Sequence, residues 1–264
     1  GFVNALFTAA SATCVTGLVV FDTWSQFTFF GQLIILILIQ TGGLGFMTIA
    51  ILFSMVLGKR IGLRERSYVM EAVSSMQISG VVRLVKHIIM GTLIFEIIGA
   101  TILSIKFYPI FGLSKGIWFG IFHSVSAFCN AGFDLMGTLE PYSSLTHFST
   151  DVVVNLVVMS LIVIGGIGFI VWDDLFTKKL NYRKYKLHTK VVLTSTVILI
   201  LVSFILFMIV ERDNVLDGLS MGDRVLASMF HSITPRTAGF NTIDTANLTE
   251  ASSFLTMILM FIGA

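Results

Sequence analysis

The sequence predicts an all-α integral membrane protein built from repeated helical units, and three observations support this fold class. First, 55% of the 264 residues are hydrophobic and 12% are charged, about half of the roughly 25% charged residues in an average soluble domain. Second, several apolar stretches have membrane-spanning length. Third, one short motif occurs three times. Because so few charged side chains cannot cover a surface in water, the composition excludes a soluble globular protein.

Four segments approach or exceed the roughly 20 apolar residues that a helix needs to cross a bilayer. They are residues 31–57, 87–107, 150–172 and 191–210, and a fifth apolar run begins near Ser253. Three other apolar stretches are too short to span, namely residues 2–12, 117–128 and 225–233. Such stretches indicate re-entrant half-helices, whose non-helical ends must be buried in protein or line a watery cavity.

Most basic residues lie in two connections between the predicted spans. Residues 58–86 and 173–190 hold twelve of the seventeen Lys and Arg residues. Since these residue types are enriched in cytoplasmic loops, both connections are predicted to be cytoplasmic, with the half-helices at the outer side. The basic residues either fix this topology alone or also bind anionic membrane lipid or a cytosolic partner. We expect no nucleic-acid partner.

Three stretches repeat one pattern: a Phe, small and hydroxyl residues, a short triplet ending in Gly, and an apolar residue. They are "ALFTAASATCVTGLVVFD" (5–22), "GIFHSVSAFCNAGFDLMG" (120–137) and "SMFHSITPRTAGFNTID" (228–244). The following helix repeats as well, in "QTGGLGFMTIAILF" (40–53), "VIGGIGFIVWDDLF" (163–176) and "FIGA" (261–264), where Gly263 matches Gly42 and Gly165. A fixed repeat is the signature of equivalent structural units.

The repeat divides the chain into three pore units. Residues 1–57 form the first unit without its leading helix, 87–172 the second, and 191–264 a truncated third; the connections 58–86 and 173–190 separate them. Residue 1 already lies in a helical pattern, and an apolar run is still in progress at Ala264. We therefore expect an internal piece of a longer protein, with a fourth unit absent from this chain.

A unit of this kind cannot bury its polar loop alone, so we expect several copies around one axis. Backbone carbonyls of the loops then replace the hydration shell of a cation, as in potassium-channel filters. Glycine permits the positive φ that aims successive carbonyls to one side, and the half-helix C-terminus adds partial negative charge. The sequence thus predicts repeated helix–pore half-helix–filter loop–helix units around a central, potassium-channel-like pore.

The predicted filter contains four residues from each unit. These are Cys14, Val15, Thr16, Gly17, Cys129, Asn130, Ala131, Gly132, Arg236, Thr237, Ala238 and Gly239. The last three of each group are expected to bind the ion through backbone carbonyls, so the variation among their side chains is compatible with one shared role.

The motifs "TCVTGL", "FCNAGFD", "TPRTAGFNTID", "GGLGF" and "GGIGF" resemble those of the Trk/Ktr/HKT superfamily of potassium transporters, most closely its KtrB-type membrane subunits. The resemblance covers the whole chain in order and spacing. A single Gly per loop, repeated within one chain, distinguishes these motifs from the "TVGYG" filter of ordinary potassium channels.

The resemblance implies the function and its setting. It implies potassium translocation across the bacterial plasma membrane through four linked pore units, by a multi-pass, non-enzymatic subunit of a Ktr-type uptake system. It also implies a homodimer, a cytosolic RCK-type regulatory ring that alone binds nucleotide, and sodium as an activator. In the family, the helix after the third filter breaks into a glycine-rich gating loop, which is expected to begin near "FIGA".

The residue before each triplet allows different interpretations. Cys14 and Cys129 are either small side chains that fit behind the filter or a metal-binding or redox pair. Arg236 takes the equivalent place in the third unit. A buried cation beside a cation path is costly unless it is paired. Arg236 is therefore expected to point away from the axis and to pair with an acidic residue, either in this chain or in the missing part of the protein.

Several membrane-embedded residues also leave alternatives open. Glu96 lies inside a predicted span and is either functional or hydrogen-bonded to a neighbouring half-helix or loop. His123 and His231 either pack behind the filter or bind ions. The mid-helix glycines either bend the helices or allow close helix contacts; they are Gly42, Gly43, Gly45, Gly165, Gly166 and Gly168.

Two other functions are alternatives to potassium transport. One is transport of another small monovalent cation, sodium or ammonium. The other is a membrane-embedded enzyme that uses His123, Cys129 and Asp134. The enzyme hypothesis does not explain why the loop recurs in the third unit without a Cys or an equivalent Asp before Asp244, so no enzymatic activity is predicted.

Overall fold

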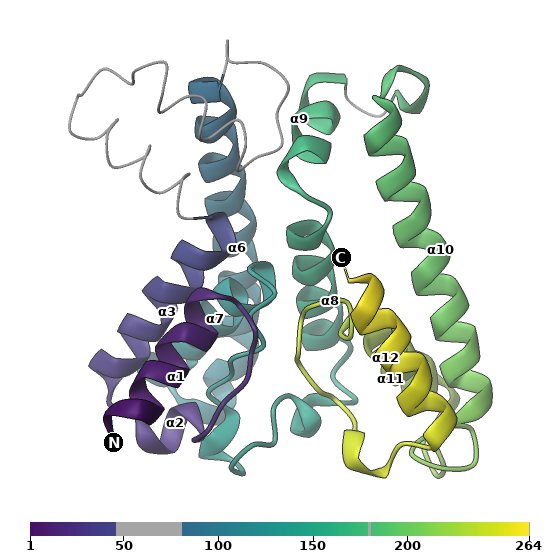
Figure 1. Cartoon of the computed structure of the whole chain (residues 1–264). Coiled ribbons are helices and arrows are strands. Elements are labelled where there is room, and N and C mark those ends of the chain that lie inside the picture. The colour runs from purple at the N-terminus through teal and green to yellow at the C-terminus, as the bar shows by residue number, and fades with distance from the viewer. Residues whose placement is uncertain (46–80, 179–180, 264) are drawn as a thin grey trace.

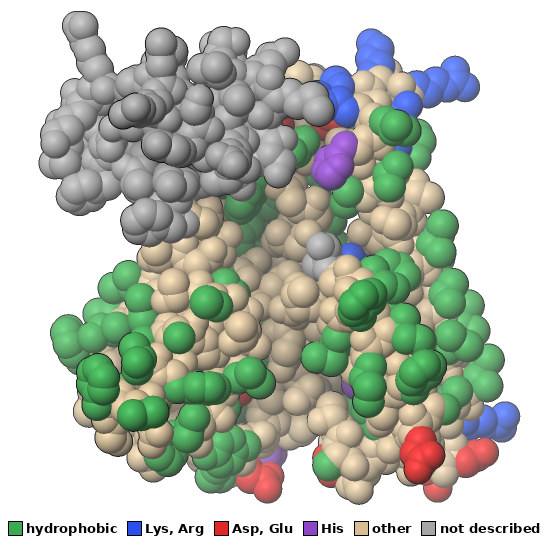
Figure 2. All heavy atoms as spheres, viewed as in Figure 1, with side chains coloured by type: hydrophobic (Ala, Val, Ile, Leu, Met, Phe, Trp, Pro, Cys, Tyr) green, Lys and Arg blue, Asp and Glu red, His purple; other side chains and the backbone are tan. Residues whose placement is uncertain are grey.

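The computed structural model describes residues 1–45, 81–178 and 181–263, and every regular element in these ranges is a helix (Figure 1). Most helices run between two opposite ends of the molecule. Figure 2 shows Lys and Arg side chains gathered mainly at the end formed by the α9–α10 connection, and Asp and Glu side chains at the opposite end. This separation follows the predicted topology.

The first unit contains α1 (Phe2–Thr13), α2 (Thr23–Gln26) and α3 (Phe29–Leu44). The helix α1 matches the short helix predicted at 2–12. The turn into α2 begins at Asp22, whose carboxylate accepts a hydrogen bond from the Ser25 amide at 2.8 Å. Such N-caps satisfy backbone donors that a helix leaves free.

The second unit begins with α6 (Val81–Phe111) and α7 (Leu113–Phe128), which meet at Gly112. The short 3₁₀ turns η1 (Met136–Thr138) and η2 (Thr146–Phe148) follow the second triplet. They lead to α8 (Val152–Gly166) and α9 (Phe169–Lys178). Asp151 caps α8 through the amides of Val153 and Val154 and pairs with Lys106 at 2.9 Å.

The third predicted unit contains α10 (Leu187–Val210), α11 (Met221–Ile233), the 3₁₀ turn η4 (Thr245–Asn247) and α12 (Glu250–Ile262). The 3₁₀ turn η3 (Tyr182–Lys184) lies in the connection before it. The buried Glu211 ties α10 to α12, because its carboxylate accepts from the Thr249 hydroxyl at 2.6 Å and the Thr249 amide at 3.0 Å.

Two predicted spans are not continuous helices. The span predicted at 150–172 breaks at Gly168, whose φ is +84°, and α8 and α9 meet at an angle of 95°. The span predicted at 31–57 ends at Leu44, before Gly45 with φ of +78°; its remainder lies outside the described residues. Both breaks occur where a left-handed glycine interrupts an apolar run, and apolar composition alone does not reveal them.

Among the described residues, two helices, within 85–111 and at 187–210, are long and apolar enough to cross a membrane, and the bent pair α8–α9 gives a third span if it is counted as one. The chain is therefore a membrane protein. Of the predicted cytoplasmic connections, 58–80 lies outside the described residues. The connection 173–190 is organised by buried Asp174, which accepts from the Lys186 amide and the Thr189 hydroxyl, both at 2.8 Å.

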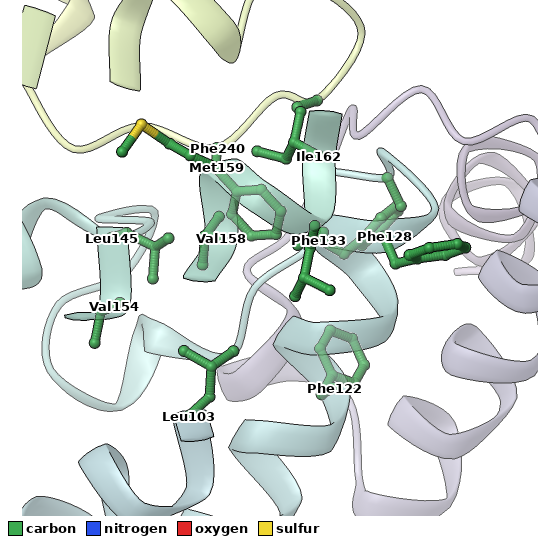
Figure 3. Close-up of a cluster of buried hydrophobic side chains, with 14 of the residues drawn as sticks. Leu103, Phe122, Phe128, Phe133, Leu145, Val154, Val158, Met159, Ile162 and Phe240 are labelled. Carbon is green, nitrogen blue, oxygen red and sulfur yellow. The ribbon is translucent and has the colours of Figure 1, made fainter. Parts of the chain in front are cut away.

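The main hydrophobic core lies between the second unit and its neighbours. Figure 3 shows Leu103 of α6, Phe122 of α7 and Val158 of α8 in this core. They surround Phe133 and Phe240, the residues directly after the second and third filter glycines, and all five are fully buried. The core therefore packs against the back of two predicted filter loops and fixes their position.

Candidate ion-binding site

Each predicted filter loop starts where a short helix ends near the middle of the molecule. The helices α1 and α7 end at Thr13 and Phe128, and their caps, Cys14 and Cys129, have nearly identical backbone angles. The third helix, α11, ends at Ile233, followed by Thr234 and Pro235 before Arg236. The negative ends of three helix dipoles thus precede the three triplets.

The triplets share one unusual backbone conformation. Their first residues, Val15, Asn130 and Thr237, have φ of +56°, +55° and +73°. Their last residues, Gly17, Gly132 and Gly239, have φ of +73°, +70° and +81°. A β-branched residue with positive φ is a genuine outlier, and such strain clusters at functional sites. The three triplets therefore share positive φ at their first and last positions.

The three triplets meet one another although they are more than 100 residues apart in sequence. A Cβ atom added to Gly17 would lie 2.7 Å from the carbonyl oxygen of Ala131, and one added to Gly132 would lie 2.7 Å from that of Ala238. Glycine at these positions therefore serves close approach as well as positive φ. The first loop contacts the second, and the second contacts the third.

Hydroxyl groups of the pore helices hold the second and third loops from behind. Ser126 Oγ donates to the carbonyl of Phe133 at 2.7 Å, and Thr234 Oγ1 donates to that of Phe240 at 2.5 Å. In the second and third units, a hydroxyl group at the end of the pore helix therefore donates a hydrogen bond to the carbonyl of the residue after the glycine. In the first unit Ser11 instead pairs with Thr16, hydroxyl to hydroxyl, at 2.8 Å.

The glycines of the following helices have two separate uses, so both predicted interpretations apply. A Cβ at Gly42 would collide with the carbonyl oxygen of Thr13, and one at Gly165 with that of Phe128, the equivalent residue. These two glycines permit close contact with the end of each pore helix. Gly45 and Gly168 instead have positive φ, and a Cβ added to either would meet no described atom within 4 Å, so they end or bend their helices.

Gly263 behaves differently from the prediction that matched it to Gly42 and Gly165. It has φ of +75° and caps α12, as Gly45 caps α3, and does not lie inside a helix. Its carbonyl oxygen faces the third filter and accepts a hydrogen bond from Arg236 Nε at 3.2 Å.

Among the described residues, Arg236 has no acidic partner, so its pairing with an acidic residue in the rest of the protein stays a prediction. Its guanidinium donates to the Gly263 carbonyl and, at 3.4 Å, to Thr196 Oγ1 of α10. The side chain is buried and is directed at α10 and α12. The charge is thus stabilised by a carbonyl dipole and a hydroxyl.

The two cysteines are free thiols, so they form no disulfide with each other. Cys129 Sγ donates to Gln40 Oε1 at 3.8 Å, while Cys14 is exposed. Within residues 1–45, 81–178 and 181–263, no group of three or more His, Cys, Asp or Glu side chains could hold a metal ion. The contacts of Cys129 Sγ with Gln40 and with the backbone at Gly43 are compatible with a small side chain that packs behind the filter.

The two histidines make packing contacts behind the filter. His123 is fully buried; its Nδ1 lies 2.7 Å from the Phe119 carbonyl, and its Nε2 accepts from the Leu135 amide at 3.3 Å. Both ring nitrogens are therefore occupied, which argues against the base required by the enzyme hypothesis. His231 packs edge-on against Phe207 and lies 3.3 Å from Thr256 Oγ1.

A cavity of about 130 Å³ opens directly beyond the filter glycines. Its lining includes Gly17, Gly132 and Gly239 together with Asp22 and Asp134. Burial raises the pKa of Asp134 to about 6; the Met136 amide lowers it and nearby Asp22 raises it again. Each aspartate follows a filter glycine within five residues, but the sequence pattern singled out Asp134 only for the enzyme hypothesis and Asp22 not at all.

The whole chain is similar to known cation transport proteins. The family model described as TrkH, cation transport protein, matches residues 1–264. The chain is 46% identical over 265 residues to Ktr system potassium uptake protein B of Bacillus subtilis, covering 100% of this chain and 58% of that protein. It is 45% identical to potassium/sodium uptake protein NtpJ of Enterococcus hirae, covering 99% and 57%. The chain thus spans less than two thirds of these relatives.

The fold is also similar to a solved structure. The crystal structure of the potassium transporter TrkH from Vibrio parahaemolyticus matches with a TM-score of 0.69 and 20% identity, covering 99% of this chain and 49% of that one. The predicted fold class and the resemblance drawn from the filter motifs are both confirmed. This chain belongs to the TrkH family of cation transport proteins.

Proposed function

We propose that the full-length protein carries potassium across the plasma membrane as the pore-forming subunit of a Ktr-type uptake system, by passive permeation. The observation that carries the proposal is the shared left-handed conformation of three triplets that contact one another. Carbonyls arranged in this way replace the water around a potassium ion. The twelve predicted filter residues keep the roles assigned above, with Arg236 holding its loop from outside the ion path.

A fourth unit beside the first loop is part of this proposal. Thr13, Cys14 and Thr16 are exposed, whereas Asn130 and Ala131 of the second loop are buried against neighbouring elements. The first and third loops both contact the second. One further unit between the first and third would complete a ring of four carbonyl donors.

Sodium is a second candidate for the transported ion. The relative from Enterococcus hirae, 45% identical, is named a potassium/sodium uptake protein. The number and field strength of the coordinating carbonyls decide between the two ions. Ammonium, which is similar in size to potassium, is a further candidate for the transported ion.

The assembly is proposed from the relationship to Ktr proteins. We propose a homodimer in the membrane, a cytosolic RCK-type ring that holds the nucleotide, and sodium as an activator. The basic connection after α9 supports a cytosolic contact, because Arg183, Lys184 and Lys186 are all exposed at one end of the molecule. The same side chains suit anionic lipid headgroups.

Growth of a bacterium that lacks its own potassium uptake tests the proposal. The full-length protein should restore growth at low potassium, and Gly132→Ser at equal membrane level should not. Uptake of rubidium should be inhibited by potassium more strongly than by sodium or ammonium. Normal membrane insertion without restored growth would contradict potassium transport, and stronger inhibition by sodium or ammonium would favour those ions.

A further inference from the structure

Glu96 is a buried acidic residue that the filter itself does not use. It lies in the 27-residue apolar span of α6 and is 6% exposed. An ionisable side chain at such a position is costly and is retained where it has a specific task. The contacts of the Glu96 side chain therefore indicate what this task is.

A chain of polar contacts leads from Glu96 to the second filter loop. Glu96 Oε2 accepts a hydrogen bond from Gln40 Nε2 at 3.2 Å. Gln40 Oε1 in turn accepts from Cys129 Sγ at 3.8 Å. The chain joins α6, α3 and the C-cap of α7, and it ends at the residue directly before the second triplet.

The backbone supports this chain on both sides. Ser124 Oγ of α7 donates to the Glu96 carbonyl at 2.7 Å, so α6 also holds the pore helix directly. A Cβ at Gly43 would lie 2.5 Å from Cys129 Sγ. The thiol is thus confined between α3 and its acceptor, and a small change at Gln40 is passed to Cys129.

The other carboxylate oxygen, Oε1, is buried and has no hydrogen-bond partner among the described residues. Buried polar atoms are normally satisfied, and an exception calls for an explanation. In the part of the chain that the structure describes, the carboxylate of Glu96 makes its hydrogen bond to Gln40.

We propose that Glu96 is a positioning residue that, through Gln40, fixes Cys129 and thereby the carbonyls of the second filter triplet. This inference rests on the proposed function for its effect on ion selection. Glu96 does not touch the ion. It sets the filter geometry on which discrimination between potassium and sodium depends, because selectivity follows the arrangement of the carbonyls.

The first test measures the position of Cys129 without reference to transport. In the full-length Cys14→Ser protein, we expect Glu96→Leu and Gln40→Leu to raise the rate of Cys129 modification by a small thiol reagent about tenfold, as loss of one ordinary hydrogen bond allows. Glu96→Gln keeps an acceptor for Gln40 and should react at the wild-type rate. An unchanged rate in Glu96→Leu would overturn the proposal, whether or not the protein transports potassium.

The second test measures ion discrimination in reconstituted liposomes. Glu96→Leu should lower the rubidium-to-sodium flux ratio about tenfold, Glu96→Gln should not, and Glu96→Leu combined with Gln40→Leu should lower it no further. Thr92→Val is the matched control, because Thr92 lies one turn away, is buried, and has an unpartnered hydroxyl. An equal loss in Thr92→Val, additive losses, or an unchanged ratio in Glu96→Leu would overturn the effect on selection. A wild type that carries neither ion would instead contradict the proposed function.

Discussion

At the scale of single residues, the most informative feature is positive φ at the first and last position of each triplet. The glycines were recognisable from the repeat, since glycine is the usual residue where φ is positive. The left-handed conformation of Val15, Asn130 and Thr237 was not, because no side-chain property shared by these residues favours it. In the first two units the left-handed residue ends the pore helix, because the following amide donates back to a helix carbonyl: Thr16 to Ser11 at 3.0 Å and Ala131 to Ser126 at 2.8 Å.

Gly132→Ala tests the close approach of the filter loops. The added methyl group would lie 2.7 Å from the Ala238 carbonyl oxygen at a residue with φ of +70°, so we expect rubidium uptake to fall at least about tenfold, since the strain is about 1–3 kcal/mol. Gly222→Ala is the control, because its nearest neighbour is 3.8 Å away. Wild-type uptake by Gly132→Ala would contradict the assigned filter geometry.

Asp134 predicts a specific pH dependence of stability. Its folded-state pKa of about 6 lies above the ordinary 3.8, so the folded protein binds the proton more tightly than the unfolded chain. This group therefore stabilises folding increasingly as pH falls from about 6 toward 4, by up to about 2–3 kcal/mol. Thermal unfolding in detergent should show this increase for wild type and lack it for Asp134→Asn. An identical pH profile for both proteins would refute the assignment.

At the scale of helices, the sequence predicted the half-helices well. Apolar stretches at 2–12, 117–128 and 225–233 correspond to α1, α7 and α11, because the length of an apolar run is a local signal. Hydropathy did not predict the breaks at Gly45 and Gly168, since the apolar runs continue through both. The average hydropathy of a segment does not depend on the backbone dihedral angles of its glycines.

Gly42→Ala tests the close contact between α3 and the first pore helix, α1. The new Cβ would collide with the Thr13 carbonyl, so α3 must move or α1 must shift, at a cost of about 1–3 kcal/mol. We expect a lower unfolding temperature in detergent. Gly31→Ala on the same helix meets only the Phe27 side chain, at 3.3 Å, and should cost clearly less. Equal decreases in unfolding temperature for the two substitutions would contradict a stabilising role of the close contact between Gly42 and Thr13.

At the scale of the whole molecule, three loops separated by long helices form one site. The internal repeat predicted this meeting, because equivalent loops in repeated units must be buried together. It did not predict the partner of Arg236, which is the Gly263 carbonyl. Nor did it predict the link from Glu96 to Cys129, since Gln40, the residue that joins them, lies in another unit.

The central claim is that a monovalent cation sits between the backbone carbonyls of these loops. Anomalous diffraction from crystals of the full-length protein grown in rubidium tests it directly. The account predicts anomalous peaks surrounded by the carbonyl oxygens of Val15–Gly17, Asn130–Gly132 and Thr237–Gly239. Rubidium peaks absent from these carbonyls and present only beside Asp22 and Asp134 in the outer cavity would contradict it.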